Sequence, residues 1–192
     1  MSEITELLRQ ANQGDNDAAH QVFKLTYDEL RRMAAMKLYG DSAGETLQPT
    51  ALVHEAYLRL IGKEDFPSFE NARHFFGSAA QAMRRVLVDR ARAKATQKRS
   101  GERLELVMDF NQIGVDIDLR PYEFLALDEL LTELELHDPQ AAELINLRFF
   151  ANLTHQQAAE TLGITRRVAD RLWALARAWL YVRLKQQLTG DA

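Results

Sequence analysis

The sequence predicts an all-α protein made of two small helical domains joined by an acidic linker. Apolar residues recur at three- and four-residue steps over most of the chain, and no segment shows the alternation of a strand. The four prolines and nine glycines fall mostly where a helix would end. With 192 residues, 46% of them hydrophobic and 27% charged, the chain has the composition of a soluble globular protein.

The first domain is predicted over residues 1–99 as a unit of four helices. Ser2 is an N-cap candidate for the first helix, and Asp15 or Asn16 can cap the second. Pro49 stands at the start of the third. The expected helices are one that ends before Gly14 and three over about residues 16–39, 50–61 and 71–98.

The stretch of residues 100–121 has neither clean helical nor alternating spacing and is predicted to be the linker. The second domain then covers residues 122–192. Both domains are small, near the lower limit for a core that folds alone.

Charge is distributed in three blocks along the chain. Residues 84–103 hold eight basic and two acidic residues, a net charge of +6. Residues 105–143 hold eleven acidic residues and one arginine, net −10, and residues 144–185 hold seven basic and two acidic residues, net +5. Blocks that lie on separate faces of the protein can act as separate charged surfaces, because salt screens electrostatic interactions over about 8–10 Å. A solvated helix face is the alternative interpretation of any one basic block.

Several classes of protein are excluded by composition. The chain has no cysteine, so disulfides, thiolate metal sites and a cysteine nucleophile are absent. No apolar run approaches the roughly 18 residues of a membrane span, and no signal pattern opens the chain, so we expect a cytoplasmic protein. His54-Glu55 begins like a zinc-protease motif, but Leu58 stands in place of the second histidine, and no metal site is predicted.

The segment from Thr154 to Thr165 predicts a helix-turn-helix. Thr154 and Gln157 have the spacing of a capping box, and a helix of about eight residues would end at Gly163, which can adopt a positive φ. Thr165 would cap a longer helix that runs to about Leu188. A structural helical hairpin is the alternative. The candidate DNA-contacting residues are Thr165, Arg166, Arg167 and Arg171, in the first turns of the second helix.

This segment resembles region 4 of extracytoplasmic-function (ECF) sigma factors of bacterial RNA polymerase, through Leu162-Gly163-Ile164-Thr165 and the sequence Leu-Ala-Arg-Ala-Trp-Leu at 175–180. Residues 52–60 are similar to the region 2 helix that docks on the polymerase clamp, and residues 68–92 to the regions that melt and read the −10 element. The resemblance covers nearly the whole chain in the expected order. The chain is similar in particular to the ECF-like subgroup whose clamp helix reads His-Glu-Ala-Tyr.

The resemblance implies a sigma factor that directs promoter recognition and transcription initiation and has no catalytic activity or cofactor. It assigns −10 binding and core polymerase binding to residues 1–99 and −35 binding to residues 122–192. Its partners would be the RNA polymerase core enzyme and promoter DNA, and an anti-sigma factor is compatible with it. We do not expect a membrane partner.

The resemblance also assigns residues to two further sites. The residues matching the region that binds the −10 element, where family members hold a flipped base, are Asn71, Arg73, His74 and Phe75, followed by Arg85 and Arg92. Arg85, Arg92 and Arg99 recur every seven residues as a basic stripe that can follow phosphates. Core packing is the alternative role for Phe75, and it is the preferred role for Phe76. Arg84 flanks the basic stripe, and a solvated position without a DNA contact is an equally good interpretation of it. The candidate polymerase-binding residues are His54, Glu55, Tyr57, Leu58 and Arg59.

The recognition helix departs from the family pattern. Val168-Ala169-Asp170 stands where Thr-Val-Lys is usual. Ala169 offers less apolar volume where the two helices are expected to be pinned together, and Asp170 places a negative charge near phosphates. Both substitutions are expected to weaken recognition of the −35 element.

A stand-alone helix-turn-helix regulator is the alternative function, and the near-neutral net charge and acidic middle favour the sigma factor. An enzyme has little support, since the sequence has no glycine-rich phosphate loop or nucleophile elbow. The charge blocks lead to one hypothesis about regulation. Acidic residues 105–143 would fold back on basic residues 84–103 in the free protein and hide DNA-binding surface. Neutralising the acidic side chains should then raise DNA binding, and the residues chosen for this are Asp116, Asp118, Asp128 and Glu129.

Overall fold

The structure is a computed structural model that describes residues 2–22, 24, 25, 27, 49–61, 68–96 and 121–189. Every regular element within these ranges is an α-helix, which confirms the all-α prediction. The part of the second predicted helix after residue 27 and the predicted linker lie outside the described residues, apart from residue 121. So do Asp116, Asp118 and Arg99.

The first half of the chain forms α1 (Ser2–Asn12), a helical stretch over residues 16–22, α3 (Pro49–Ile61) and α4 (Ala72–Thr96). Asp15 caps the helical stretch, because its Oδ1 accepts hydrogen bonds from the backbone N–H groups of Asp17 and Ala18 at 2.9 and 3.0 Å. Pro49 begins α3 as predicted, since proline has no N–H to lose at the first helical position.

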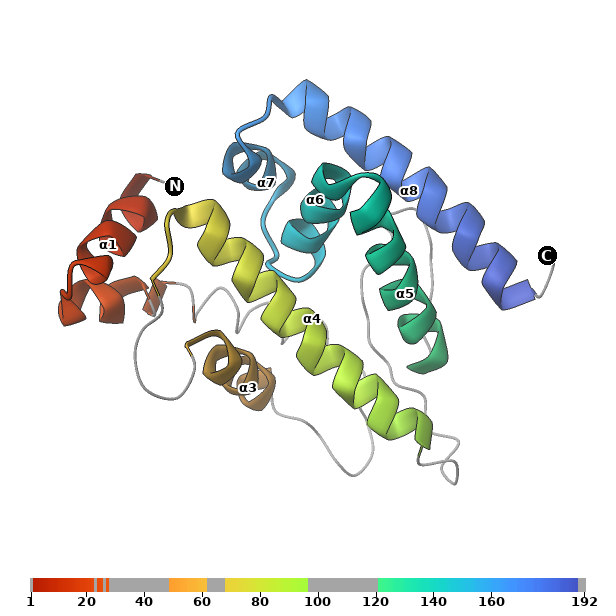
Figure 1. Ribbon diagram of the computed structural model, residues 1–192, viewed down its shortest axis with the longest axis horizontal. Coiled ribbons are helices and arrows are strands. Elements are labelled where there is room, and N and C mark those ends of the chain that lie inside the picture. Colours follow the sequence, from red (N-terminus) through yellow and green to blue (C-terminus); the bar gives the residue numbers. More distant parts are fainter. Residues whose placement is uncertain are drawn as a thin grey trace.

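The long helix α4 is the central element of the molecule. It packs against α3 on one side and against α5 (Pro121–His137) and α6 (Pro139–Phe149) on another (Figure 1). Packing on two sides explains why its apolar residues surround the helix more widely than a single amphipathic stripe would. Phe75, Met83 and Leu87 are each 2% exposed or less.

The second half continues with α7 (His155–Leu162) and α8 (Arg166–Thr189), and α8 lies across α5 and α6. Asp138 caps α6 by accepting from the N–H of Ala141 at 3.0 Å, and Pro139 follows it in the first turn. These two residues turn the chain sharply between α5 and α6.

One continuous apolar cluster runs through both halves, from Leu8 in α1 to Leu184 in α8. The two predicted domains therefore lie against each other, with α4 of the first in contact with α5, α6 and α7 of the second. That each domain folds on its own stays a prediction. No helix of the described residues is long and apolar enough to cross a membrane.

Candidate nucleic-acid and polymerase interfaces

The helix-turn-helix forms as the sequence predicts. Thr154 Oγ1 accepts from the N–H of Gln157 at 3.2 Å, and Gln157 Oε1 accepts from the N–H of Thr154 at 2.8 Å, which completes the capping box. Gly163 has φ +67° and closes α7. Thr165 Oγ1 then accepts from the N–H of Val168 at 3.3 Å and begins α8, so this hydroxyl already has a structural role.

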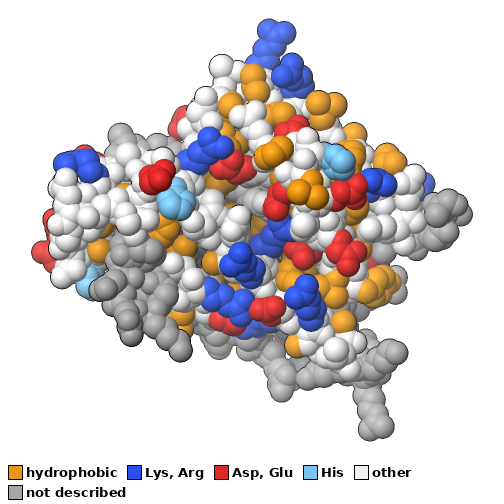
Figure 2. Space-filling model, in the orientation of Figure 1, with side chains coloured by type: hydrophobic (Ala, Val, Ile, Leu, Met, Phe, Trp, Pro, Cys, Tyr) orange, Lys and Arg blue, Asp and Glu red, His pale blue; other side chains and the backbone are white. Residues whose placement is uncertain are grey.

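The first turns of α8 expose one face, which we call the recognition face: Arg166, Arg167, Asp170, Arg171 and Ala174. The inner side of the same turns is buried and includes Ala169, which is 0% exposed. The structure therefore fits the small side chain of Ala169 into the helix–helix contact without exposing it. Figure 2 shows Lys and Arg side chains gathered at the end of the molecule where α8 begins.

Behind this face, three side chains from different helices meet in a group that the sequence did not indicate. The Arg148 guanidinium lies 4.2 Å from the ring centroid of Trp173, and the His155 ring meets the edge of the same indole at 6.1 Å between centroids. Nε2 of His155 lies 2.9 Å from Oδ1 of Asp170. Burial, together with the nearby Arg148 charge, lowers the pKa of His155 below its ordinary value, although Asp170 opposes the shift.

The start of α4 gives structural roles to several residues assigned to the −10 site. Asn71 caps the helix, because its Oδ1 accepts from the N–H of His74 at 3.0 Å, and His74 Nδ1 accepts from the N–H of Glu70 at 3.3 Å. Both side chains remain exposed. Arg73 donates two hydrogen bonds to the carboxylate of Glu143 on α6, at 2.8 and 2.6 Å. This pair raises the pKa of Arg73.

Phe75 does not fit its assigned role. A side chain that holds an unstacked base must present its ring to solvent, whereas Phe75 is 2% exposed and packs edge-to-face against Phe69 and Phe76. In this structure Phe75 is therefore a core residue, as the alternative interpretation of the sequence held, and its role at the −10 element stays a prediction. Phe76 is also buried, as the sequence favoured.

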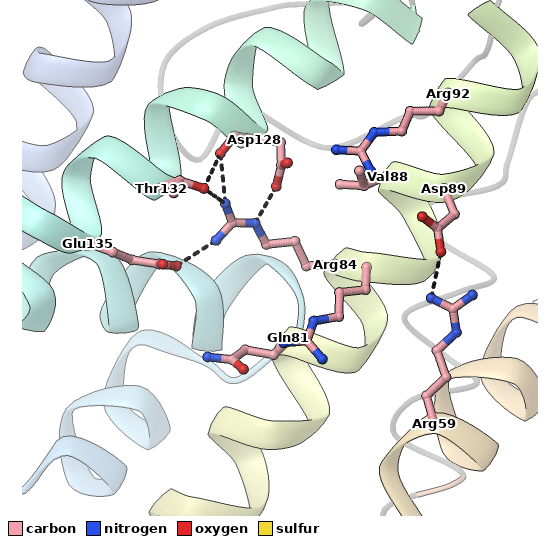
Figure 3. Close-up of a pocket in the computed structure, with 10 residues that line it drawn as sticks. Arg59, Gln81, Arg84, Val88, Asp89, Arg92, Asp128, Thr132 and Glu135 are labelled. Atoms are coloured by element: carbon pink, nitrogen blue, oxygen red, sulfur yellow. Dashed lines mark hydrogen bonds and ion pairs between the residues drawn. The ribbon is translucent and has the colours of Figure 1, made fainter. Parts of the chain in front are cut away.

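Arg84 is buried as well, in place of the solvated position considered above. Its guanidinium reaches from α4 to α5 (Figure 3). Nε donates to Oδ1 of Asp128 at 2.6 Å, one terminal nitrogen to Oε1 of Glu135 at 2.6 Å, and the other to Thr132 Oγ1 at 2.9 Å and the Asp128 carbonyl at 2.7 Å. Asn146 of α6 also donates to Glu135 Oε1, at 3.1 Å. These five residues are called the Arg84 cluster below.

Next to the Arg84 cluster, two arginines of the predicted stripe remain available. Arg85 and Arg92 are exposed, and neither has an ion-pair partner among the described residues. Both border a cavity of about 370 Å³ between α3, α4 and α5, and Arg92 extends toward it in Figure 3. A second hollow of about 630 Å³ continues along α3 and α4, where it is bordered by His74, Gln81 and Arg85.

The residues assigned to polymerase binding divide between two sides of α3. His54 and Leu58, one helical turn apart, face solvent, and Leu58 is 49% exposed although it is apolar. Arg59 faces α4 and pairs with Asp89 at 2.7 Å and Glu55 at 2.8 Å. Burial raises the pKa of the half-buried Tyr57.

No group of three or more metal-ligating side chains comes together in the described part of the chain. The sequence missed the Arg84 cluster and the group around Trp173. In both cases the partners lie on different helices, and the one available signal was the opposite charge of the blocks that contain Arg84 and Asp128.

The profile of the ECF sigma factor family matches residues 1–186, which spans both halves of the chain. Neither the curated proteins nor the solved structures gave a match. A match that extends well beyond the helix-turn-helix supports the sigma factor over a stand-alone regulator. The chain belongs to the ECF sigma factor family, whose members are transcription initiation factors of RNA polymerase.

Proposed function

We propose that this sigma factor divides promoter binding between three surfaces: the recognition face of α8 for the −35 element, the exposed side of α4 for the −10 region, and the outer side of α3 for the polymerase clamp. The observation that carries the proposal is the position of these residues. The arginines of the recognition face and the stripe arginines Arg85 and Arg92 are exposed, as phosphate and base contacts require.

For the −10 region we favour the hollow between α3 and α4 over the buried Phe75. Its border offers the planar ring of His74 and the amide of Gln81, which can stack on and hydrogen-bond to an unstacked base. Arg85 stands at the same hollow, and its charge suits the adjoining phosphate. Asn71 supports this surface indirectly, because it caps the helix that carries it.

For polymerase binding we favour His54 and Leu58 over Glu55 and Arg59. The latter two are engaged with each other and with α4, whereas an apolar side chain half exposed on a helix gains by being covered. Leu58→Glu should therefore weaken binding to core polymerase by at least tenfold and leave the helical content unchanged. Leu25→Glu is the matched control, because Leu25 is 47% exposed and lies outside α3.

The experiment that tests the function is run-off transcription with purified bacterial core polymerase, the full chain and a library of genomic fragments. Discrete start sites that depend on the protein would support the proposal and yield the −35 and −10 sequences together. DNA binding by the protein with no association with polymerase would contradict it.

A further inference from the structure

The recognition face contains one carboxylate among three arginines. Asp170 is the only acidic residue of α8, and it lies between Arg167 and Arg171 on the exposed side of the helix. A carboxylate at this place is repelled by phosphates, so it cannot contribute to binding of the DNA backbone. If it contributes to recognition, it must do so at the edges of the bases.

The Asp170 side chain is contacted from behind by His155. Nδ1 of His155 lies 3.5 Å from a terminal nitrogen of Arg148, and a guanidinium can only donate, so Nδ1 is the acceptor nitrogen of the ring. The ring hydrogen is then assigned to Nε2, which lies 2.9 Å from Oδ1 of Asp170 but is not aligned with it as a hydrogen-bond donor in this structure. The Trp173 ring contacts both the guanidinium of Arg148 and the imidazole of His155.

This arrangement leaves the other carboxylate oxygen, Oδ2, available. The Asp170 side chain is 60% exposed, and its one ion-pair contact among the described residues is made through Oδ1. The surrounding arginines are donors that suit guanine, whereas an ionised carboxylate only accepts. The amino groups that project into the major groove belong to cytosine and adenine, and the carboxylate pairs with the N4 amino group of cytosine.

We infer that Asp170 is a specificity-determining residue that accepts a hydrogen bond from a cytosine amino group in the −35 element, and that His155 is the positioning residue that holds its carboxylate. The inference rests on the proposed function, since it deepens the role of the recognition face. It changes the meaning of the acidic departure from the family pattern: the charge lowers affinity for DNA in general and increases discrimination between sequences.

The test is selection by the holoenzyme, assembled from core polymerase and the full chain, on promoters with a randomised −35 element. The wild-type protein should select cytosine at one position. Asp170→Asn should reduce the discrimination at that position by roughly tenfold, the lower part of the range for one good base contact, and leave the other positions unchanged. Glu160→Gln is the matched control, because Glu160 is an exposed acidic residue of α7 that pairs with Gln156 in the same helix.

Two variants of His155 separate positioning from folding. His155→Leu should weaken selection at the same position, and His155→Gln, whose amide can donate toward Asp170, should restore most of it. Identical base preferences for the wild type and Asp170→Asn would overturn the inference, as would an equal gain in affinity for every sequence. A wild-type holoenzyme that selects no −35 sequence would overturn the proposed function, and the inference with it.

Discussion

The guanidinium Nε of Arg84 lies 2.6 Å from Oδ1 of Asp128, which joins the middle of α4 directly to α5. The Arg84 side chain is 9% exposed and the Asp128 side chain 19% exposed, so solvent screens the pair only weakly. Breaking a buried pair leaves the remaining charge without compensation, which makes the two residues interdependent.

Asp128→Asn is expected to lower the free energy of unfolding by about 2 kcal/mol, because a hydrogen bond to a charged group contributes roughly that amount. Glu135 and Thr132 still bind Arg84 in this variant, which limits the loss. Urea unfolding measures the change. Glu129→Gln is the control: it removes the same charge from the next, exposed position, and its effect should stay within about 0.5 kcal/mol.

The same two variants test whether the acidic region hides DNA-binding surface. The structure places acidic α5 against basic α4, and that this contact competes with DNA stays a prediction. In free protein at low salt, Asp128→Asn should bind promoter DNA more tightly than Glu129→Gln does, because only the former removes a carboxylate that binds Arg84. Affinities that stay at the wild-type value in both variants would refute the hypothesis.

Opening of the α4–α5 contact can be followed directly. The chain has no cysteine, so the double variant Ala95→Cys, Gln186→Cys takes two dyes at exposed positions of α4 and α8. We expect lower energy transfer when Asp128→Asn is added and no change when Glu129→Gln is added. Unchanged transfer in both would mean that the contact stays closed without this ion pair.

Acidification is expected to destabilise the helix-turn-helix through His155. Its pKa in the folded state lies below the ordinary value of 6.5. Well above pH 6.5, His155 is neutral in both the folded and the unfolded protein. As the pH falls below 6.5, His155 is protonated first in the unfolded chain, so the free energy of unfolding decreases. Urea unfolding at pH 7 and pH 5.5 should show a smaller loss for His155→Gln than for the wild type. His20→Gln controls for removal of an imidazole, and an equal loss in all three proteins would contradict the assignment.

Two glycines give opposite expectations for the same substitution. Gly163 has φ +67°, and Gly77 lies inside α4; an added Cβ would meet nothing within 4 Å at either position. Gly163→Ala should lower stability by about 1 kcal/mol through backbone strain alone. Gly77→Ala should raise it by about 0.5–1 kcal/mol, because alanine restricts the unfolded chain. Thermal or urea unfolding of the two variants checks both signs.

If the stripe arginines contact phosphates, their replacement should reduce the salt dependence of promoter binding. Arg85→Gln and Arg92→Gln, each measured in holoenzyme, should reduce the slope of log affinity against log salt concentration by about 0.7–0.9 for each phosphate that the variant no longer neutralises. Arg9→Gln is the control, because Arg9 pairs with Glu6 within α1. A slope that stays at the wild-type value in both stripe variants would show that α4 does not bind the DNA backbone.

The local features of this fold could be predicted from the sequence, because each depends on residues a few positions apart. Asp15 caps its helix, Thr154 and Gln157 form the capping box, and Gly163 takes the positive φ of the turn. A cap needs only a short side chain next to free backbone N–H groups, and nothing distant competes with it. The limits of α3 also agree with the prediction, since the proline at its start is a local signal as well.

The long-range features could not be predicted in the same way. Arg84 and Arg85 are neighbours with the same charge, yet one is buried against α5 and the other faces solvent. The way α4 packs against α5 decides between them, and the sequence does not show it. By its chemistry the Phe75 ring can either stack on an unpaired base or pack in the hydrophobic core. Its contacts with the rings of Phe69 and Phe76 place it in the core.

The continuous apolar cluster from Leu8 to Leu184 determines how the protein unfolds. When two halves share one core, neither can melt without exposing the inner surface of the other, so the closed protein unfolds in a single cooperative transition. A substitution at Leu131 in α5 then shortens the lifetime of α1 as well. Damage to one half of the chain therefore removes the other half as well, through degradation of the unfolded protein.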